Sequence, residues 1–342
     1  MSAEEVETIT IDRLDRRLIH ALMRDGRLPF RRIAEALGSS EQTVARRYRR
    51  LREAGVVRVI VIRNPRRYRE NTFVRIRTKP GAARLIGETL ARRDDVGWVT
   101  LAAGGTEVTC SLRSDDPRDR DALILERLPK VSRVTDVSSA TLLHVFSTGT
   151  RSDWHALDDG LTADELAELG ARPPRPAGLE AGADAPLLGP EDDELMQHLA
   201  RDGRMTYAAL AAATGRREAA VARRVDTLLE RGTLFASTEL AAPLLGFRTT
   251  ATLWLTVAPS ALERVGVEVS DHPEVEFAGA VSGQANLVVA ATCRDSPDLY
   301  RYLTRRLGAI EAIQQLEVVV AVRRLKQAGT VMEGERLPSP LT

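Results

Sequence analysis

Four arginines in one short segment, and the polar residues before them, have the chemistry to hold a nucleic acid. The segment, residues 39–50, reads SSEQTVARRYRR. Arg neutralises backbone phosphate, Gln can pair with an adenine edge, and Thr can contact a thymine methyl. The candidate contact residues are Ser39, Ser40, Glu41, Gln42, Thr43, Arg46, Arg47, Arg49 and Arg50. A solvated basic helix face without a ligand is the alternative interpretation.

The same segment occurs twice in the chain. Asp-Gly-Arg at 25–27 recurs at 202–204, and Val-Ala-Arg-Arg at 44–47 recurs at 221–224, both at an offset of 177 positions. A sequence repeat at a fixed offset indicates a duplicated folding unit.

The two copies differ in charge. Residues 1–70 contain 17 arginines against 10 acidic residues, a net charge of about +7, whereas residues 188–236 contain 7 against 8. The first copy therefore predicts a polyanionic partner. In the second copy two arginines replace the serine pair, so a helix N-cap worth about 1 kcal/mol is lost. Its candidate contacts are Arg216, Arg217, Arg223 and Arg224. We expect weaker DNA contact there, mainly through phosphates, or degeneration into a unit that only packs.

Length and composition narrow the class of protein. With 342 residues the chain is too long for one core, and no apolar run approaches the roughly 18 residues that span a bilayer. The N-terminus lacks a signal-peptide pattern, which predicts a cytoplasmic protein without a membrane partner. Cys110 and Cys293 lie in apolar runs, as buried thiols do, and a nucleophilic role is the alternative. No local metal-binding, nucleophile-elbow or phosphate-loop motif occurs, so we predict no cofactor, no metal and no catalytic residue.

The repeated segment reads as three helices followed by a strand that forms a hairpin, as in a winged helix-turn-helix. Apolar spacing and the glycines that end each helix predict helices at 11–24, 29–37 and 41–54 and a strand at 56–63. The second copy predicts helices at 195–200, 207–214 and 217–231. The second helix of the motif would place residues 40–43 near base edges.

After each helix-turn-helix the order of elements becomes β-α-β-β-α-β, the ferredoxin-like plait. In the first half the expected elements are 72–78, 82–92, 96–102, 108–112, 119–128 and 134–146. In the second half they are 250–257, 261–270, 275–281, 286–292, 297–307 and 315–322. The predicted fold class is α+β, with two winged helix-turn-helix domains each followed by a ferredoxin-like effector domain.

These patterns divide the chain into six segments. Thr162 and Glu165 form a capping-box start for a short helix, and 171–190 has the Pro, Gly and Ala content of a flexible linker. The expected segments are a first helix-turn-helix domain (1–65), a first effector domain (66–150), a short helix and linker (151–187), a second helix-turn-helix domain (188–240), a second effector domain (241–332) and a disordered tail (333–342).

The chain resembles the Lrp/AsnC (feast/famine) family of transcriptional regulators. The stretch LDRRLIHALMRDGRLPFRRIAEALGSSEQTVARRYRRLREAGVV from Leu14 matches the family's N-terminal pattern. VSGQANLVVAATCRD (281–295) and, more weakly, AAGGTEVTCSLRSDD (102–116) are similar to the strand-turn-strand of its effector (RAM) domain. The resemblance implies a double-stranded DNA partner and a role in transcription. A typical member carries one copy and dimerises, whereas this chain looks like two fused protomers.

The resemblance also implies a small-molecule site, usually for an amino acid, between the paired effector domains. The positions that correspond to it are Gly104, Gly105, Thr106, Glu107, Gly283, Gln284 and Asn286. Only Glu107 keeps a carboxylate that could pair with a ligand's ammonium group, so we expect a changed ligand or a lost one. Tight turns without a ligand are the alternative.

Two other functions compete with regulation. Fused proteins of similar architecture include siroheme decarboxylases, which are thought to use histidine near a tetrapyrrole. The histidines here are isolated from one another in the sequence: His20, His144, His155, His198 and His272. We therefore expect a regulator rather than an enzyme. The third possible function is that of a ligand-independent assembly module that shapes DNA. Exposed sheet edges would let the chain form a homo-oligomer, whether it acts as a regulator or as an assembly module.

Overall fold

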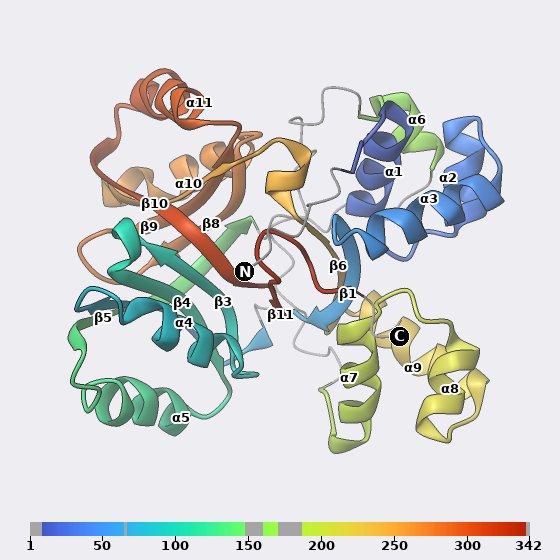
Figure 1. Ribbon diagram of the computed structural model, residues 1–342, viewed down its shortest axis with the longest axis horizontal. Coiled ribbons are helices and arrows are strands. Elements are labelled where there is room, and N and C mark those ends of the chain that lie inside the picture. Colours follow the sequence, from blue (N-terminus) through green and yellow to red (C-terminus); the bar gives the residue numbers. More distant parts are fainter. Residues whose placement is uncertain (1–8, 65–66, 148–159, 170–186, 340–342) are drawn as a thin grey trace, which may run out of the picture.

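The computed structural model describes residues 9–64, 67–147, 160–169 and 187–339. The two helix-turn-helix units lie on one side of the molecule, and the two effector halves lie together on the other (Figure 1). Most of the predicted linker falls outside the described residues.

The three helices of each helix-turn-helix unit form where the sequence predicts them, within two residues at every helix end. The helices of the two units are α1 (Arg13–Arg24), α2 (Phe30–Leu37) and α3 (Glu41–Glu53), then α7 (Asp193–Arg201), α8 (Tyr207–Thr214) and α9 (Glu218–Glu230). Buried aliphatic side chains from all three helices form each core, with Ile33 and Val44 in the first and Leu210 and Val221 in the second. Burial of this apolar face explains why short helices are stable here.

The predicted hairpin within each unit is wrong. The strand after the first unit, β1 (Val57–Arg63), pairs antiparallel with the strand after the second, β6 (Leu234–Leu240). Each unit contributes one strand, and a lone strand leaves its backbone groups unpaired unless another segment satisfies them. The equivalent strand of the other unit does so, and the resulting two-stranded ribbon links the two units (Figure 1).

Both effector halves have the ferredoxin-like order of elements that the sequence predicts. The first contains β2 (Glu70–Thr78), α4 (Ala83–Ala91), β3 (Val96–Ala102), β4 (Glu107–Ser114), α5 (Pro117–Asp121), which continues as a π-helical turn (Ala122–Arg127), and β5 (Val134–Ser147). The second contains β7 (Thr249–Val257), α10 (Leu262–Ser270), β8 (Val275–Val281), β9 (Leu287–Cys293), α11 (Ser296–Arg301), with a π-helical turn (Tyr302–Arg306), and β10 (Ile313–Gln327). The strand orders are β3-β4-β2-β5 and β8-β9-β7-β10.

The two sheets join into one closed barrel of eight strands. The last strand of each half pairs with the second strand of the other, β5 with β8 and β10 with β3. The sheet edges expected to support stacking are thus paired within the chain. Val74 and Ile76 of β2 pack outward under α4, whereas Phe73 points inward beside Trp254. A short strand, β11 (Thr330–Val331), extends the sheet beside β10.

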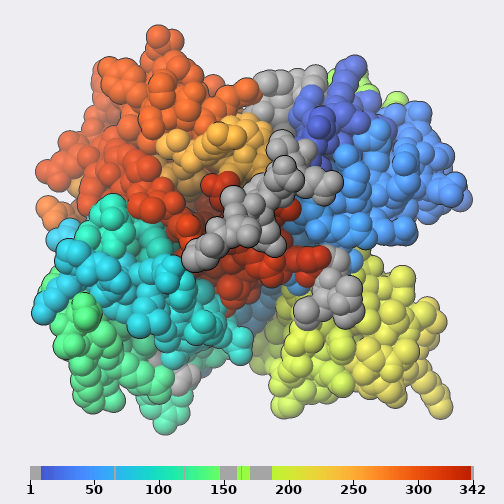
Figure 2. All heavy atoms as spheres, viewed as in Figure 1, coloured from blue at the N-terminus to red at the C-terminus, as the bar shows by residue number. Residues whose placement is uncertain are grey.

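Segments outside these domains also pack. Helix α6 (Ala163–Glu168) starts at Thr162 with the predicted capping box, and Leu169 packs into the first helix-turn-helix core. The predicted disordered tail is wrong for residues 333–339, because Leu337 is 1% exposed and its N–H donates to the Gly55 carbonyl at 2.9 Å. The C-terminal segment, red in Figure 2, lies between the effector half and both helix-turn-helix units.

Candidate DNA-binding interface

The N-terminal turn of α3 is formed and open to solvent. Ser40 is the N-cap residue, and its Oγ accepts a hydrogen bond from the Thr43 N–H at 3.1 Å. Glu41 and Gln42 are exposed at the start of the helix, while Ser39 and Thr43 are half-buried. In α9 the N-cap residue is Arg217, which makes no side-chain cap hydrogen bond. The first unit thus presents a better-defined turn.

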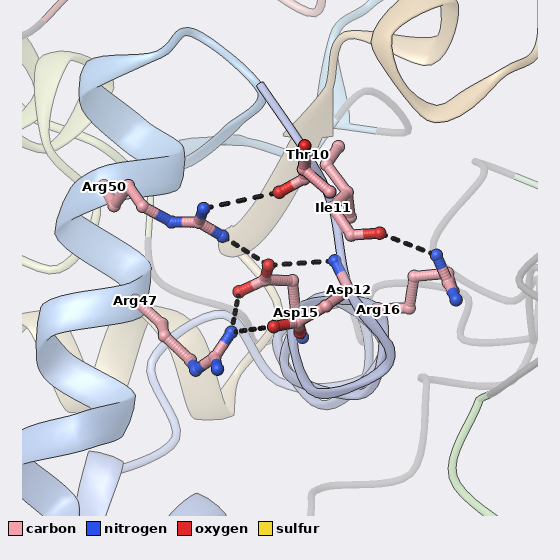
Figure 3. A network of polar contacts seen from close by, with 7 residues as sticks. All are labelled: Thr10, Ile11, Asp12, Asp15, Arg16, Arg47 and Arg50. Carbon is pink, nitrogen blue, oxygen red and sulfur yellow. Dashed lines mark hydrogen bonds and ion pairs between the residues drawn. The ribbon is translucent and has the colours of Figure 1, made fainter. Parts of the chain in front are cut away.

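The basic residues of α3 divide into two pairs. Arg46 and Arg49 are exposed and form no ion pair with a described carboxylate. Arg47 and Arg50 instead turn back to the start of α1, where both reach Asp15 (Figure 3). The prediction that all four arginines form one phosphate-facing set is therefore revised, because Arg47 and Arg50 already have carboxylate partners inside the unit.

The carboxylates at the start of α1 hold these two arginines. Arg47 Nη1 lies 2.7 Å from Asp12 Oδ2 and 2.9 Å from Asp15 Oδ1, and Asp15 is 0% exposed. Burial raises the pKa of Asp12, but hydrogen bonds from the Asp15 N–H and from Arg47 outweigh it and lower the pKa overall. The hydrogen bond with Asp12 likewise raises the pKa of Arg47. The pair therefore stays ionised at neutral pH and fixes α3 against α1.

The second unit repeats this pair at the equivalent positions. Arg224 reaches Asp192 with two hydrogen bonds, Nε to Oδ1 at 2.9 Å and Nη2 to Oδ2 at 2.6 Å, and Asp192 is 1% exposed. Arg216 donates to the Glu191 carbonyl, which leaves Arg217 and Arg223 as the exposed cations. Among the eight arginines of the thirteen proposed contact residues, the side chains of Arg47, Arg50, Arg216 and Arg224 have partners within the chain. DNA contact by all thirteen residues stays a prediction.

The repeated Asp-Gly-Arg motif joins the two units. Arg27 Nη1 donates to the Gly203 carbonyl at 2.5 Å, and Arg204 Nη1 donates to the Gly26 carbonyl at 2.5 Å. The exchange is reciprocal, so each arginine reaches across to the other copy of its own motif. The repeat is visible in the sequence, but no sequence feature assigns it to an interface.

Aromatic rings extend this contact. The Arg204 guanidinium lies 4.0 Å from the centroid of the Phe30 ring, and that of Arg27 lies 5.0 Å from the Tyr207 ring. The close approach of the two units requires glycine at position 203, because a Cβ there would lie 2.6 Å from the backbone of Ile60. The two units are therefore held in one fixed relation.

The predicted effector residues of the first half do not form a free anionic site. Glu107 is 3% exposed, and Arg75 donates to it from Nε and Nη2, both at 3.1 Å. Arg75 also pairs with Glu317 at 2.7 Å. The carboxylate of Glu107 is thus neutralised. Gly104 and Gly105 have positive φ values of 64° and 86°, as a tight turn requires.

The second half differs. The side chain of Asn286 uses both ends of its amide on Val257, with N···O distances of 2.8 and 2.7 Å. Gly283 and Gln284 line an open cavity of about 430 Å³ at the barrel mouth, together with Arg75. Of the seven predicted effector positions, Gly283 and Gln284 are the ones that line a described cavity. The Thr106 hydroxyl donates a hydrogen bond to the Ala103 carbonyl in its own turn.

A second cavity, of about 180 Å³, lies between the barrel interior and the β1–β6 ribbon. His20, His144, His198 and His272 line neither cavity, and His155 lies outside the described residues. In the described ranges, no cluster of His, Cys, Asp and Glu suits a metal ion.

Two further features of the described chain bear on function. Burial raises the pKa of the Cys110 thiol to about 12, and that of Cys293 to about 12, so neither is a nucleophile at neutral pH. Within the described ranges, no helix has the length and apolar content needed to cross a membrane.

Two helix-turn-helix units, linked by a ribbon to paired ferredoxin-like sheets, define the architecture of a helix-turn-helix regulator with an attached ligand-binding domain. Family comparison finds an AsnC-type helix-turn-helix domain at residues 11–52 and again at 192–229. It finds the Lrp/AsnC ligand binding domain at 250–331. This chain is a tandem member of the Lrp/AsnC family.

Single-copy regulators are among its relatives. HTH-type transcriptional regulator LrpA of Pyrococcus horikoshii is 30% identical over 136 residues, which are 39% of this chain and 96% of that protein. HTH-type transcriptional regulator FL11 of Pyrococcus abyssi is 28% identical over 119 residues, 34% of this chain and 79% of that one. Each of these relatives thus matches a length of this chain equal to about one of its two copies.

A full-length likeness exists at the level of the fold. The crystal structure of the siroheme decarboxylase NirDL matches 93% of this chain and 93% of its own, with a TM-score of 0.59 and 14% identity. At this identity the likeness shows that the tandem fold is shared.

Proposed function

We propose that this chain is a cytoplasmic, sequence-specific DNA-binding transcriptional regulator, and not an enzyme, that contacts DNA mainly through α3. One observation carries the proposal: the capped N-terminal turn of α3 is exposed next to two arginines, Arg46 and Arg49, that have no described carboxylate partner. Such a turn reads base edges in a major groove, and unpaired arginines bind phosphate.

The second unit contributes less under this proposal. Arg217 and Arg223 are exposed but share their helix with Glu218 at its first turn. They supply phosphate contact with little base reading. Because the Asp-Gly-Arg contact fixes the two units, the half-sites lie about one helical turn of DNA, or a multiple of it, apart.

The experiment is a salt-dependent binding titration on the DNA upstream of the chain's own gene, with a scrambled duplex as control. Arg46→Ala/Arg49→Ala removes two phosphate contacts, so the slope of log K against log salt becomes shallower by about 2 and affinity falls at least tenfold. Arg217→Ala/Arg223→Ala lowers affinity about threefold. Arg31→Ala, an exposed arginine of α2, is the matched control and changes neither.

Two results would overturn the proposal. Equal affinity for the scrambled duplex would remove sequence-specific binding. A larger effect in the second pair than in the first would move the dominant contact to α9.

We also propose that the chain self-associates, but through a different surface from the one predicted from the sequence. With the barrel closed, a homo-oligomer would use outer surfaces rather than sheet edges. Light scattering across a concentration series tests this directly, and a constant mass of one chain would contradict it.

The second candidate function is tetrapyrrole chemistry, which the full-length fold likeness favours. A solved complex of NirDL contains an iron-uroporphyrin III analogue. Against it stands the position of the four described histidines, which line neither cavity. The cavity under the ribbon, with about 180 Å³, is also smaller than the one at the barrel mouth, with about 430 Å³. A saturable shift of the Soret band on addition of iron-uroporphyrin III, lost in a cavity variant, would favour the enzyme; an unchanged spectrum favours the regulator.

A further inference from the structure

The cavity between the barrel and the β1–β6 ribbon holds a group of buried polar atoms without partners. Four of the described polar atoms that lack a hydrogen bond belong to residues that line it: Asn71 Oδ1, Ser111 Oγ, Arg113 Nε and Glu239 Oε1. Each such atom costs free energy when left dry, and their occurrence at one cavity calls for an explanation. A bound group that supplies hydrogen bonds is the simplest one.

The charge in the cavity is unbalanced. Arg113 forms no ion pair with a described carboxylate. Burial lowers its pKa, and its side chain forms a hydrogen bond with Tyr68, whose ring centroid lies 5.9 Å from Cζ. The other cavity arginine, Arg324, is already paired with Glu276 at 2.8 Å. Burial raises the pKa of Glu239 to about 8, so this carboxyl is neutral at pH 7. One positive charge therefore remains uncompensated.

The backbone of β3 is shaped around that charge. Gly97 lies against the guanidinium of Arg113, and a Cβ at this position would stand 2.5 Å from Cζ. Lys326, a second cation near Arg113, is buried and donates to the Arg93 carbonyl at 2.6 Å. Asp94 and Asp95 lie near Lys326 and act to raise its pKa against the lowering by burial. The charge of Lys326 therefore has acidic neighbours, and Arg113 is the cation lining the cavity that has no described carboxylate partner.

The remaining wall is aromatic, and the space is small. Four rings line the cavity: Phe73, Trp98, Phe235 and Phe277. A dry cavity of about 150 Å³ in another protein accepts benzene, so 180 Å³ has room for one ring, or two fused rings, with a small substituent. A tetrapyrrole is far larger than this.

We propose that this cavity is a binding site for a small aromatic carboxylate, with the ring among the four aromatic side chains and the carboxylate on Arg113. A planar carboxylate can accept two hydrogen bonds from one guanidinium. The ligand would touch both the barrel and the ribbon, since Ile62 of β1 and Phe235 of β6 line the same space. In the proposed regulator this cavity would be the site that senses a small molecule. Ligand binding does not depend on DNA binding; only its role in regulation rests on the proposed function.

The test uses the full chain and benzoate, with isosteric benzamide as the neutral probe, in calorimetric titration without DNA. Tryptophan fluorescence gives a second readout because Trp98 lines the cavity. Wild type is expected to bind benzoate at least tenfold more tightly than benzamide. Arg113→Gln is expected to weaken benzoate at least tenfold and to remove the preference, while Arg113→Lys keeps a preference for the anion.

Control variants separate loss of the site from loss of the fold. Arg264→Gln, an exposed arginine on α10, should bind benzoate as wild type does. Gly97→Ala keeps the charge but crowds the guanidinium, and should weaken benzoate with an unchanged urea midpoint. Equal affinity of wild type for the two probes, or no saturable benzoate binding up to about 10 mM, overturns the proposal and leaves water as the occupant.

A final arm distinguishes this proposal from the regulatory one. DNA titrations with and without saturating benzoate measure the coupling between the cavity and the recognition helices. Benzoate binding in a chain that binds no specific DNA supports the cavity and rejects the regulator. Specific DNA binding without any benzoate binding does the reverse.

Discussion

The two helix-turn-helix units share the contacts that hold them together and differ in those that face outward. Both keep a buried aspartate paired with an arginine of the recognition helix, Asp15 with Arg47 and Asp192 with Arg224. The serine N-cap of the first recognition helix is replaced by Arg217 in the second. The comparison teaches that arginines at repeated positions can serve the fold, whereas a DNA-binding surface must be sought among exposed, unpaired cations.

Removal of the buried aspartate gives the largest expected difference between the units. Asp15→Ala leaves Arg47 and Arg50 without this partner and is expected to lower the free energy of unfolding by about 3 kcal/mol. Asp192→Ala leaves one arginine and should cost about 2 kcal/mol. Urea unfolding measures both, with Asp193→Ala as the exposed control. A larger loss for Asp192→Ala would break the comparison.

The two ribbon strands differ in one buried acid. Glu239 of β6 stands where β1 has Ile62, 177 positions earlier, and burial raises the pKa of Glu239 to about 8 although Thr330 donates a hydrogen bond to it. Between about pH 4.5 and 8 the folded chain therefore holds a proton that the unfolded chain has lost. Stability contributed by this group falls as pH rises through that window.

Glu239→Gln removes that titration and keeps an acceptor for Thr330. Relative to wild type, the variant should gain about 2.5 kcal/mol in unfolding free energy between pH 5 and pH 7, since one pKa unit corresponds to 1.36 kcal/mol. Chemical unfolding at the two pH values measures the gain. A constant difference between the two chains would show that Glu239 ionises normally.

The reciprocal arginines are expected to contribute unequally. Arg204 lies 4.0 Å from the Phe30 ring centroid and donates to the Leu28 carbonyl at 2.9 Å. Arg27 lies farther from its corresponding partners, 5.0 Å from the Tyr207 ring centroid and 3.5 Å from the Met205 carbonyl. Arg204→Met should cost about 2 kcal/mol and Arg27→Met about 1 kcal/mol. Unfolding midpoints measure both, and Arg31→Met controls for loss of an exposed arginine. Equal costs would indicate a symmetric contact.

The smallest effect concerns the helix caps. Arg217→Ser gives α9 the hydroxyl cap that α3 already has and should stabilise the chain by about 0.5–1 kcal/mol, while Ser40→Ala should cost about 1 kcal/mol. Thermal unfolding detects both changes. If Arg217→Ser had no effect while Ser40→Ala did, a factor other than the cap would limit α9.

Local signals explain what the sequence predicted well. The Ser40 cap, the glycine that ends each recognition helix and the Thr162 capping box all involve groups within a few residues of one another. Their hydrogen bonds form wherever the segment becomes helical, so spacing alone indicates them. The same holds for the apolar periodicity that predicted both ferredoxin-like halves.

The candidate site was less predictable. Periodicity places Arg47 on the outer side of α3 but cannot tell a free guanidinium from one held by a carboxylate 32 residues away. Nor does the sequence near Glu107 show that Arg75, on another strand, neutralises it. The cavity under the ribbon is lined from both halves of the chain, and no local motif marks it.

The sequence by itself determined the duplication, the order of elements in each copy and the family to which they belong, because these depend on local hydrogen bonds and on the period of apolar side chains. Tertiary structure alone decided that β1 pairs with β6 and that the two sheets close into one barrel. Strand pairing satisfies backbone groups without regard to side-chain identity, so several partners suit one strand until packing selects among them. That selection brings Arg113, the four rings and the ribbon around one small cavity.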